Sequence, residues 1–248
     1  MKISVITVCY NSEKFIEDAI KSVLNQSYQE IEYIVIDGGS KDNTLAIISK
    51  YKSFINTFIS EPDKGIYDAM NKGINVATGD YIAFLNSDDF YTNTEAIASV
   101  VAVLKETKVD SLYANINYVR PLDVESIVRK WRTGSFDKHR FQYGWHPAHP
   151  TFVVKKEVYD KYGSFNLSFS LAADFELMLR FLECYKISHY YLDEVLIHMR
   201  LGGATSSGFK NFVKQNIECM KAFKVNGLKV SIFYPFYRLL PKLSQFIH

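Results

Sequence analysis

The sequence predicts an α/β protein in which a mostly parallel sheet is flanked by helices and followed by a helical, amphipathic carboxy-terminal segment. The first observation is that short β-branched runs alternate with stretches of helical periodicity, which is typical of β-α-β units. The second is that polar residues follow each of the first predicted strands. The third is composition: 248 residues that are 48% hydrophobic and 23% charged bury a sizeable core, which excludes disordered, collagen-like and disulfide-scaffold proteins.

The amino-terminal half contains the regular alternation of strands and helices. After the first strand, Asn11 or Ser12 is placed to cap a helix whose apolar residues recur at helical spacing up to Leu24. The pair Thr78-Gly79 ends the last helix of this half. The predicted strands cover residues 2–8, 31–36, 55–59 and 81–85, and the helices between them run to residue 24, to about residue 51 and over about 65–76.

The second half is less regular. Residues 120–144 mix charged and aromatic side chains, which predicts a mobile loop or lid, and the proline-containing run 145–150 predicts a rigid turn. No internal repeat or linker divides the chain, so residues 1–207 are predicted to form one unit. The remaining predictions are helices at about 94–107, 155–162 and 173–185, and strands at about 111–119, 151–154, 187–192 and 195–199.

The carboxy-terminal segment, residues 208–248, differs in charge from the rest of the chain. It carries seven Lys or Arg and one Glu, net +6, which leaves 22 basic and 26 acidic residues, net −4, in residues 1–207. Its basic residues alternate with apolar and aromatic ones, a pattern typical of segments that lie on an anionic membrane surface. The alternatives are packing on the body or a homodimer contact. Because the basic charge is confined to this segment, no nucleic-acid binding is expected.

The cysteines and the amino terminus predict the compartment. Cys9, Cys184 and Cys219 are far apart and form no CxxC pattern, which predicts reduced thiols rather than disulfides or structural zinc. The first apolar stretch is too short for a signal peptide, and no later stretch approaches about 18 uninterrupted apolar residues. We therefore expect a cytoplasmic protein, attached peripherally to the inner face of the cell membrane.

Polar residues follow four predicted strands. Because the carboxyl ends of parallel strands meet at one edge of a sheet, we expect these residues to converge on one crevice. Each of them alone is an ordinary turn residue, so their joint placement is what points to function. They are Thr7, Tyr10 and Asn11 after the first strand, Asp37 after the second, Glu61 and Asp63 after the third, and Asp88 and Asp89 after the fourth.

Two adjacent carboxylates, those of Asp88 and Asp89, repel each other unless a cation or a donor-rich ligand offsets their charge. Mg2+ or Mn2+ prefers oxygen ligands, commonly one or two carboxylates together with phosphate oxygens of a substrate. A metal ion held here would make a bound diphosphate a better leaving group, since it offsets the charge that develops on the departing oxygen. The alternative is that Asp89 caps the helix near residue 94.

Asp174 is the candidate general base. It stands at the start of an otherwise apolar helix, where the helix dipole favours the ionised carboxylate that a base requires. The alternative is that Asp174 is only the residue that caps this helix.

Six segments of the chain together resemble the family 2 inverting glycosyltransferases, which have the GT-A fold, a Rossmann-like α/β fold. They are, in order, ISVITVCYNSEKFIEDAIKSVLNQSY, IEYIVIDGGSKDNT, SEPDKGIYDAMNKGI, GDYIAFLNSDD, HPTFVVKKEVYDKYGSFN and LAADFELMLRF. The resemblance extends over about residues 1–206. It implies a nucleotide-sugar-binding half, residues 1–110, and an acceptor-binding half with the catalytic base, residues 111–207. Asn86 stands at the first acidic position of the family's Asp-x-Asp signature, so Asp88 is assigned as the main metal ligand, with Asp89 near it or near the donor.

The resemblance implies roles for residues at the other strand ends. Thr7 and Tyr10 would lie against the nucleotide base, with Tyr10 stacking on it, and Asp37 would hydrogen-bond the base. Asp174 matches the family's catalytic base, which deprotonates the acceptor hydroxyl for in-line attack on the anomeric carbon and so inverts its configuration. The remaining residues expected to bind the nucleotide-sugar are Asn11, Asp63, Lys64 and Asn71.

Four further residues of the second half are assigned through the resemblance. His146 and His149 precede a strand close to where the family forms its acceptor site, although histidines in such places are often packed or surface residues. Arg200 and the run 202–206 resemble the loop that closes over the donor diphosphate, where an Arg can hold phosphate oxygens bidentately. The alternative for this run is a plain turn. His198 is a minor candidate for the metal shell.

The function predicted from these residues is transfer of a sugar from a nucleotide-diphospho-sugar, with UDP favoured, to a hydroxyl of a glycan acceptor. A lipid-linked acceptor in surface polysaccharide assembly fits the predicted membrane attachment. One alternative is a nucleotidyltransferase, but the run TVCYNSEKF lacks the glycine-rich phosphate loop of such enzymes. The other is a non-catalytic subunit that binds nucleotide-sugar or glycan, which would need neither Asp88 nor Asp174.

Overall fold

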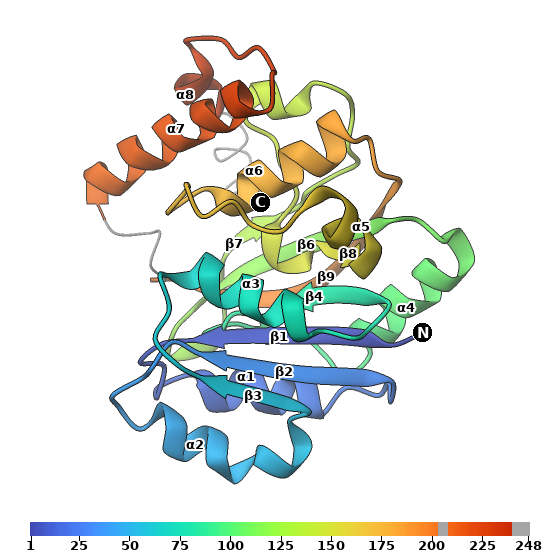
Figure 1. Ribbon diagram of the computed structural model, residues 1–248, viewed down its shortest axis with the longest axis vertical. Coiled ribbons are helices and arrows are strands. Elements are labelled where there is room, and N and C mark those ends of the chain that lie inside the picture. The colour runs from blue at the N-terminus through green and yellow to red at the C-terminus, as the bar shows by residue number, and fades with distance from the viewer. Residues whose placement is uncertain (203–207, 240–248) are drawn as a thin grey trace.

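The computed structural model describes residues 1–202 and 208–239, in which strands and helices alternate through the first half of the chain (Figure 1). The strands are β1 (Ile3–Cys9), β2 (Ile31–Asp37), β3 (Thr57–Ser60), β4 (Tyr81–Phe84), β5 (Phe90–Tyr91), β6 (Ser111–Arg120), β7 (Asp123–Trp131), β8 (Val153–Lys155) and β9 (His189–Arg200). The helices are α1 (Ile16–Leu24), α2 (Thr44–Lys50), η1 (Lys52–Phe54), α3 (Ile66–Val76), α4 (Ala96–Thr107), η2 (Arg140–Tyr143), η3 (His149–Thr151), α5 (Lys156–Tyr162), α6 (Ala173–Leu179), the π-helical turn η4 (Arg180–Cys184), α7 (Gly208–Val225) and α8 (Tyr234–Tyr237).

The strands form one nine-stranded sheet in the order β3-β2-β1-β4-β8-β6-β9-β5, with β7 paired to β6 outside this path. The pairs β3-β2, β2-β1 and β1-β4 are all parallel, so the predicted parallel sheet of the first half is confirmed. Cys9 lies opposite Asp37, and Asp37 lies opposite Ser60. The carboxyl ends of β1, β2 and β3 are therefore level with one another and form one edge.

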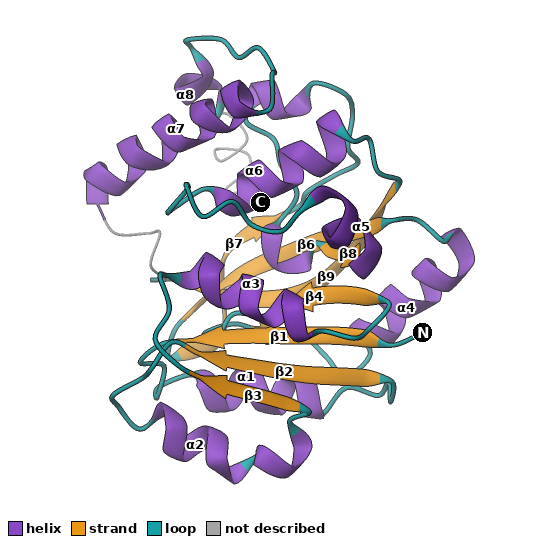
Figure 2. Ribbon diagram, in the orientation of Figure 1, coloured by secondary structure: helices purple, strands orange, loops and turns teal. Residues whose placement is uncertain are grey.

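Hydrophobic cores fill both faces of this sheet, and helices cover them (Figure 2). Side chains of a strand alternate between faces, so on β1 Ile6 and Val8 pack with α3, whereas Ile3 and Val5 pack with α1 and α4. A Cβ atom on Gly73 of α3 would lie 2.5 Å from a methyl group of Ile6. Glycine at this position lets α3 lie close against the sheet.

Two predictions about the start of α1 and the middle of the chain are wrong. The helix α1 begins at Ile16, whose amide donates to the backbone carbonyl of Ser12 at 3.0 Å. The side chains of Asn11 and Ser12 bond to other loops instead, so neither side chain caps the helix. Residues 123–131, predicted to lie within a loop or lid, form β7, which pairs antiparallel with β6. No side chain of β7 is fully buried, and the apolar Ile127 lies on its exposed side, so the sequence lacks the alternation of apolar and polar residues that reveals a strand.

The second half of the sheet is mixed rather than parallel. Strand β8 runs antiparallel to both β4 and β6, whereas β6 and β9 are parallel. The two short strands predicted at 187–192 and 195–199 are one strand, β9, whose register against β6 shifts beside Asn115. The predicted helix at 173–185 is α6 followed by the π-helical turn η4.

The carboxy-terminal helices pack on the body of the protein (Figure 1). Cys219, Ala222 and Phe223 of α7 are buried in the same core as Phe175 of α6, and so is Tyr234 of α8. For this face of the segment, the prediction of packing on the body of the protein is confirmed. Within residues 1–202 and 208–239, no helix has both the length and the apolar character that crossing a bilayer requires.

Candidate active site

Asp37 fixes the carboxyl end of β2, and its side chain is fully buried. Its carboxylate accepts hydrogen bonds from the amides of Gly39 and Ser40, both at 3.0 Å, and from the hydroxyls of Ser40 and Ser60 at 2.5 and 2.7 Å. Burial alone would raise the pKa of Asp37, but these hydrogen bonds together bring it below its ordinary value. Asp37 thus ties the loop after β2 to β3, and its contact with a nucleotide base stays a prediction.

The loop after β3 meets the loop after β2 at Asp63. A Cβ atom on Gly38 would lie 2.2 Å from Oδ2 of Asp63, so a side chain at Gly38 would exclude this approach. Oδ1 of Asp63 accepts a hydrogen bond of 2.8 Å from the amide of Gly65, whose φ of 111° favours glycine. Lys64 is exposed next to them. Two predicted site residues, Asp63 and Lys64, therefore lie at the same edge as Asp37.

The three predicted residues after β1 differ in what they offer a ligand. Thr7 is fully buried and its hydroxyl accepts a hydrogen bond of 3.2 Å from Tyr33. Asn11 has a φ of 49°, and its side-chain oxygen accepts a hydrogen bond of 2.9 Å from the amide of Lys41, which joins the loops after β1 and β2. Tyr10 is 58% exposed. Of the three, Tyr10 presents the ring on which a base would stack.

The two adjacent carboxylates after β4 lie in different surroundings. Asp89 is fully buried, and its carboxylate accepts hydrogen bonds of 3.1 Å from the backbone amide of Arg200 and from the side chain of Asn86. Burial first, and then the charge of Asp88, raise its pKa well above the ordinary value. Asp88 is half-buried, and burial raises its pKa as well. Asp89 therefore braces the loop, and Asp88 is the carboxylate left to act on a ligand.

Arg200 lies beside this loop, as a shared site requires, but its guanidinium group is engaged by the protein. It donates hydrogen bonds to the carbonyl of Asp88 (2.9 Å) and to the carboxylate of Asp18 (2.6 Å). It also lies 4.7 Å from the ring centres of Phe15 and Phe90, and the residue is only 5% exposed. In this structure Arg200 holds the backbone of the acidic loop in place, and residues 203–206 of the predicted diphosphate loop lie outside the described residues.

Oxygen atoms suited to a hard cation are present at the acidic loop. Asn86 Oδ1 is a buried oxygen without a hydrogen-bond partner among the described residues, and Asp88 forms no ion pair in the same part of the chain. These are the donors that Mg2+ or Mn2+ prefers, and such ions need few protein ligands when phosphate oxygens complete the shell. The described residues contain no cluster of three or more His, Cys, Asp or Glu suited to a metal. His198 packs its ring against Phe90, 5.4 Å between centres.

Asp174 lies in the first turn of α6, and one of its two oxygens is held. Oδ1 accepts hydrogen bonds from the hydroxyl of Tyr67 (3.0 Å) and from the amide of Phe175 (2.8 Å). No hydrogen bond from any described residue reaches Oδ2. The cap position of α6 is Ala172, so the alternative of a simple helix-capping Asp is not what the structure has. Burial and the negative charge of Asp174 raise the pKa of Tyr67 far above its usual range, so Tyr67 keeps its proton and donates it.

His149 links Asp174 to the acidic loop. Its ring stacks on Phe84, the last residue of β4, with 6.1 Å between ring centres, and it meets Phe165 edge-on at 5.9 Å. Nε2 of His149 is buried without a hydrogen-bond partner in the described part of the chain. Burial lowers the pKa of His149 while the nearby charge of Asp174 opposes this, so the imidazole is neutral at pH 7. Since Asn86 follows Phe84 by two residues, Asp174, His149 and the acidic loop lie in one region.

The remaining predicted residues pack around the same region. The side chain of Asn71 forms two hydrogen bonds of 2.9 Å with the backbone of Phe165, one as donor and one as acceptor, which fixes the loop before α6. The ring of His146 lies 5.0 Å from that of Trp131 and 5.7 Å from that of Phe175. Asn71 is therefore occupied within the protein, whereas His146 lies next to the residue that follows Asp174.

Sequence reasoning missed Tyr67 and Asp18. Tyr67 belongs to the family-like run SEPDKGIYDAMNKGI. It directly follows the Asp63 loop at the start of a predicted helix, and this position could have indicated that it lies near the site. Asp18 gave no signal, because its partner Arg200 is 182 residues away and the pairing depends on the fold.

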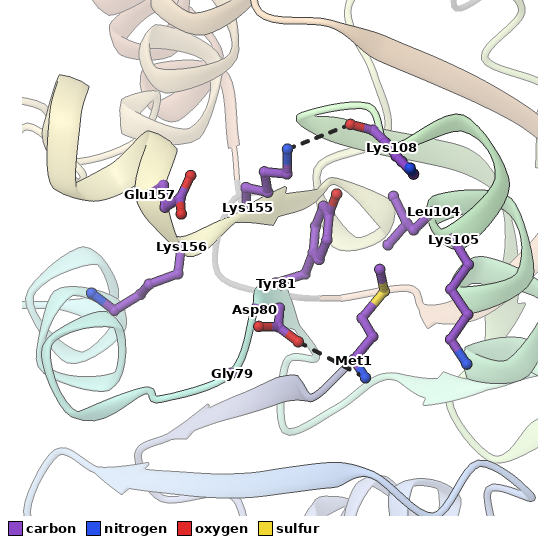
Figure 3. Close-up of a pocket in the computed structure, with 10 residues that line it drawn as sticks. All are labelled: Met1, Gly79, Asp80, Tyr81, Leu104, Lys105, Lys108, Lys155, Lys156 and Glu157. Atoms are coloured by element: carbon purple, nitrogen blue, oxygen red, sulfur yellow. Dashed lines mark hydrogen bonds and ion pairs between the residues drawn. The ribbon is translucent and has the colours of Figure 1, made fainter.

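A second groove lies at the opposite edge of the sheet and has no part in this site (Figure 3). It encloses about 560 Å³ between the amino ends of β1 and β4 and the end of α4. Its lining includes Met1, Asp80, Lys108 and Lys155, and none of the predicted site residues. The strands themselves separate it from the carboxyl edge where those residues lie.

The fold and the site define a class of protein, which sequence comparison identifies. Residues 4–163, more than half of the chain, match the family Glycosyl transferase family 2. An uncharacterized glycosyltransferase of Mycobacterium tuberculosis is 34% identical over 184 residues, which covers 72% of this chain and 68% of that protein. The chain belongs to glycosyl transferase family 2 and is a glycosyltransferase, as its motifs predicted.

Further comparisons extend over more of the chain. The UDP-Glc:alpha-D-GlcNAc-diphosphoundecaprenol beta-1,3-glucosyltransferase WfaP of Escherichia coli is 28% identical over 244 residues, covering 91% of this chain and 94% of WfaP. The crystal structure of residues 1–349 of TarS from S. aureus superposes with a TM-score of 0.70 at 22% identity, covering 99% of this chain and 71% of that chain. The mannosyltransferase PcManGT from Pyrobaculum calidifontis, in complex with GDP-Man and Mn2+, gives a TM-score of 0.68 at 17% identity, covering 98% of this chain and 69% of that chain. The predicted GT-A fold is confirmed.

Proposed function

We propose that the protein is an inverting glycosyltransferase in which Asp174 is the catalytic base. The observation that carries this proposal is the asymmetry of its carboxylate: Tyr67 and the amide of Phe175 hold Oδ1, while Oδ2 receives no hydrogen bond from the described residues. A base needs one oxygen held still and the other open to the proton of the acceptor hydroxyl. The hydroxyl oxygen then bonds to the anomeric carbon as the bond to the donor's diphosphate breaks, in one displacement that inverts the configuration.

The donor that we propose is a UDP-sugar bound at the carboxyl edge of β1, β2 and β4. Tyr10 supplies an exposed ring for the base, and Asp63, Lys64 and Asp88 lie along the same edge. WfaP uses UDP-Glc by its name, and the TarS structures include complexes with UDP and UDP-GlcNAc. WfaP and TarS support UDP as the proposed nucleotide, whereas the PcManGT complex contains GDP-Man.

We propose that Asp88, with Asn86 Oδ1, holds Mg2+ or Mn2+ against the donor diphosphate. The ion supplies charge neutralisation of the leaving diphosphate when it is bound. The support is the unpartnered oxygen of Asn86 and the absence of an ion pair at Asp88 in the described residues. Arg200 fixes the backbone of Asp88 and so sets the direction of its carboxylate.

The acceptor that we propose is the hydroxyl of a lipid-linked saccharide in surface polysaccharide assembly, with His146 and His149 near its binding site. His149 Nε2 is buried and has no hydrogen-bond partner among the described residues, and the charge of Asp174 acts on the pKa of this imidazole. The name of WfaP specifies a sugar on diphosphoundecaprenol as acceptor. Such an acceptor keeps its lipid in the membrane, so the enzyme would work at the inner face of the cell membrane.

Thermal unfolding with a panel of nucleotide-sugars, each with and without MnCl2, tests the donor and metal proposals. A ligand that binds the folded protein alone raises its melting temperature, so a UDP-sugar should stabilise it most, and more with Mn2+. Stabilisation by another nucleotide-sugar, or equal stabilisation without metal, would contradict the corresponding part of the proposal.

Replacement of Asp174 by Asn tests the base. Asp174→Asn keeps the shape of the side chain but removes its ability to take a proton, so the kcat for transfer should fall by about 100-fold or more. The shift in melting temperature caused by the UDP-sugar should remain as in the wild type, because the donor does not need the base. A variant with wild-type turnover would show that Asp174 is not the base. A wild-type protein that binds the donor without any transfer would point to the non-catalytic subunit.

A further inference from the structure

Glu218 of α7 binds the segment that leads into α6. Its carboxylate is buried, with the residue 8% exposed. It accepts hydrogen bonds from the backbone amides of Ser170 (3.1 Å), Leu171 (2.8 Å) and Ala172 (3.0 Å), and from the hydroxyl of Ser170 (2.8 Å). One side chain thus satisfies three consecutive amides, the last of which is only two residues before Asp174.

Among the described residues, no side chain of α6 itself accepts hydrogen bonds from the amides of residues 170–172. The cap residue of α6, Ala172, has no side chain that could accept a hydrogen bond. A carboxylate from a different helix takes this role, in hydrogen bonds that are stronger than neutral ones because the acceptor is charged. Burial raises the pKa of Glu218, but the hydrogen bonds from residues 170–172 outweigh this and lower it, so the group is ionised at neutral pH.

Glu218 is itself held in place by the packing of α7. Its neighbours Cys219, Ala222 and Phe223 are almost completely buried in the core that contains α6. One turn beyond Phe223, the side chain of Asn226 donates a hydrogen bond of 3.0 Å to Glu176 of α6. The carboxy-terminal half of α7, which carries Glu218, is therefore fixed to the core around α6.

The charge of Glu218 also affects Tyr67, which donates a hydrogen bond to Asp174. The pKa of Tyr67 is raised by burial and by Asp174, and Glu218 adds to the same shift. Glu218 therefore lies near the Tyr67–Asp174 pair, although it forms no hydrogen bond with either.

We propose that Glu218 is a positioning residue for glycosyl transfer: by fixing residues 170–172 it sets the place of the Asp174 carboxylate relative to the donor. The proposal rests on the role of Asp174 as the base. A displacement of about 1 Å in a reacting group can cost 100-fold in rate, so a loosened segment affects the chemical step. The printed hydrogen bonds of the Glu218 side chain go to residues 170–172 and to none of the proposed donor-binding residues, so we expect its loss to affect the position of Asp174 more than donor binding.

The test is the Glu218→Gln variant, assayed with UDP-glucose and a synthetic GlcNAc-diphospho-lipid. Gln replaces one acceptor oxygen with an NH2 group, which cannot accept a hydrogen bond from the backbone amides of residues 170–172. Part of the hydrogen bonding to this segment is therefore lost. We expect kcat to fall by about 10-fold or more while KM for UDP-glucose stays within about twofold of wild type. The matched control is Lys224→Ala, which changes an exposed α7 side chain with no side-chain hydrogen bond or ion pair among the described residues and should keep wild-type kcat.

Ser170→Ala guards against a Glu218→Gln variant that does not fold. It removes only the hydroxyl donor to Glu218, and we expect a fewfold loss of kcat with an unchanged KM. Wild-type kcat in a folded Glu218→Gln variant, or in Ser170→Ala if the former does not fold, would overturn the proposal. So would a parallel loss of kcat and donor affinity. Asp174→Asn in the same assay separates the two ideas: if it retains turnover the proposed base is wrong, and if it is inactive while Glu218→Gln is normal, only the role of Glu218 fails.

Discussion

At the scale of single residues, Tyr67 connects the two halves of the site. It lies in the first turn of α3, directly after the loop of Asp63 and Gly65, and its hydroxyl reaches Asp174 in α6. Its ring stacks on Phe165, 5.5 Å between centres, so the hydroxyl has little freedom to turn away. A protonated phenol in this position orients the carboxylate without competing for the proton that it must accept.

Tyr67→Phe should lower kcat by roughly 10-fold, since it removes one hydrogen bond to a charged oxygen and leaves the stacked ring in place. KM for the UDP-sugar should stay within about twofold. Tyr162→Phe is the control, because the Tyr162 ring packs on Tyr185 at 4.0 Å in the same half of the protein, away from Asp174. Steady-state kinetics of the three proteins decide the matter, and equal kcat values for both variants would refute a role for Tyr67.

The sequence predicted the positions of the candidate site residues in the fold better than their contacts within the protein. It predicted that Asp37, Asp63 and Asp88 follow parallel strands, and their positions at one edge agree with this. It did not predict that Asp37 is enclosed by hydroxyls and amides, or that Arg200 is bound to Asp18. Those partners lie in other loops or strands, and the pattern within one segment carries no information about them.

At the scale of elements, the strands and helices that bury one clear face were predictable, and the others were not. Helix α1 was recognised from residues such as Ile16 and Ile20, which are fully buried. Strand β7 was missed, because neither of its faces is fully buried. For α7 the pattern was read as a membrane-binding surface, but the face with Phe223 belongs to the core. Periodicity shows that a helix has an apolar face, not what that face covers.

The exposed side of α8 and of the residues just before it is the part of the carboxy-terminal segment that we propose to bind membrane. Ile232, Phe233 and Phe236 are 77%, 56% and 67% exposed, and the exposed Lys229 precedes them. Exposed aromatic and basic residues together favour the interface of an anionic bilayer.

Vesicles that contain about 30% phosphatidylglycerol test this surface by co-sedimentation. The double variant Phe233→Ser, Phe236→Ser should lower the vesicle-bound fraction strongly, because each buried Phe contributes about 1.5–3 kcal/mol. Phe54→Ser is the control, since Phe54 is 63% exposed on η1, at a distance in the chain from α8. Unchanged sedimentation of the double variant would exclude this surface, and loss of a concentration-dependent dimer instead would identify it as a contact between two copies.

At the scale of the whole molecule, buried carboxylates tie distant segments together. Glu32 accepts hydrogen bonds from the hydroxyl of Ser4 (2.5 Å) and the amide of Thr78 (2.8 Å) at the amino edge of the sheet. Asp37 does the same at the carboxyl edge, and Glu218 does so between α7 and α6. Burial alone would raise the pKa of each carboxyl group. The hydrogen bonds together lower it by more, so all three have a pKa below the ordinary value.

These lowered pKa values predict a loss of stability in acid. The contribution of each group is fully present above the ordinary pKa, 4.5 for Glu32 and 3.8 for Asp37, and disappears as the pH falls through the lowered value in the folded protein. The contribution of these three carboxylates to the free energy of unfolding should therefore be nearly constant from pH 8 to about 5 and be lost below about 4, and a comparison with Glu32→Gln isolates the part of Glu32. Glu32→Gln should melt lower than wild type at pH 7 but lose less on acidification. Parallel curves for the two proteins would contradict the assignment to Glu32.

The contact between Gly144 and Arg238 has a consequence for biosynthesis. A Cβ atom on Gly144 would lie 2.4 Å from the Cα atom of Arg238, which directly follows α8, and Tyr234 of α8 packs in the core with Phe175. The hydrophobic core beside Gly144 therefore cannot be completed until Tyr234 and Arg238, about ninety residues downstream, have left the ribosome. Newly made chains would expose apolar surface beside α6 until translation has passed this point, and an early stop codon there would leave a protein prone to degradation.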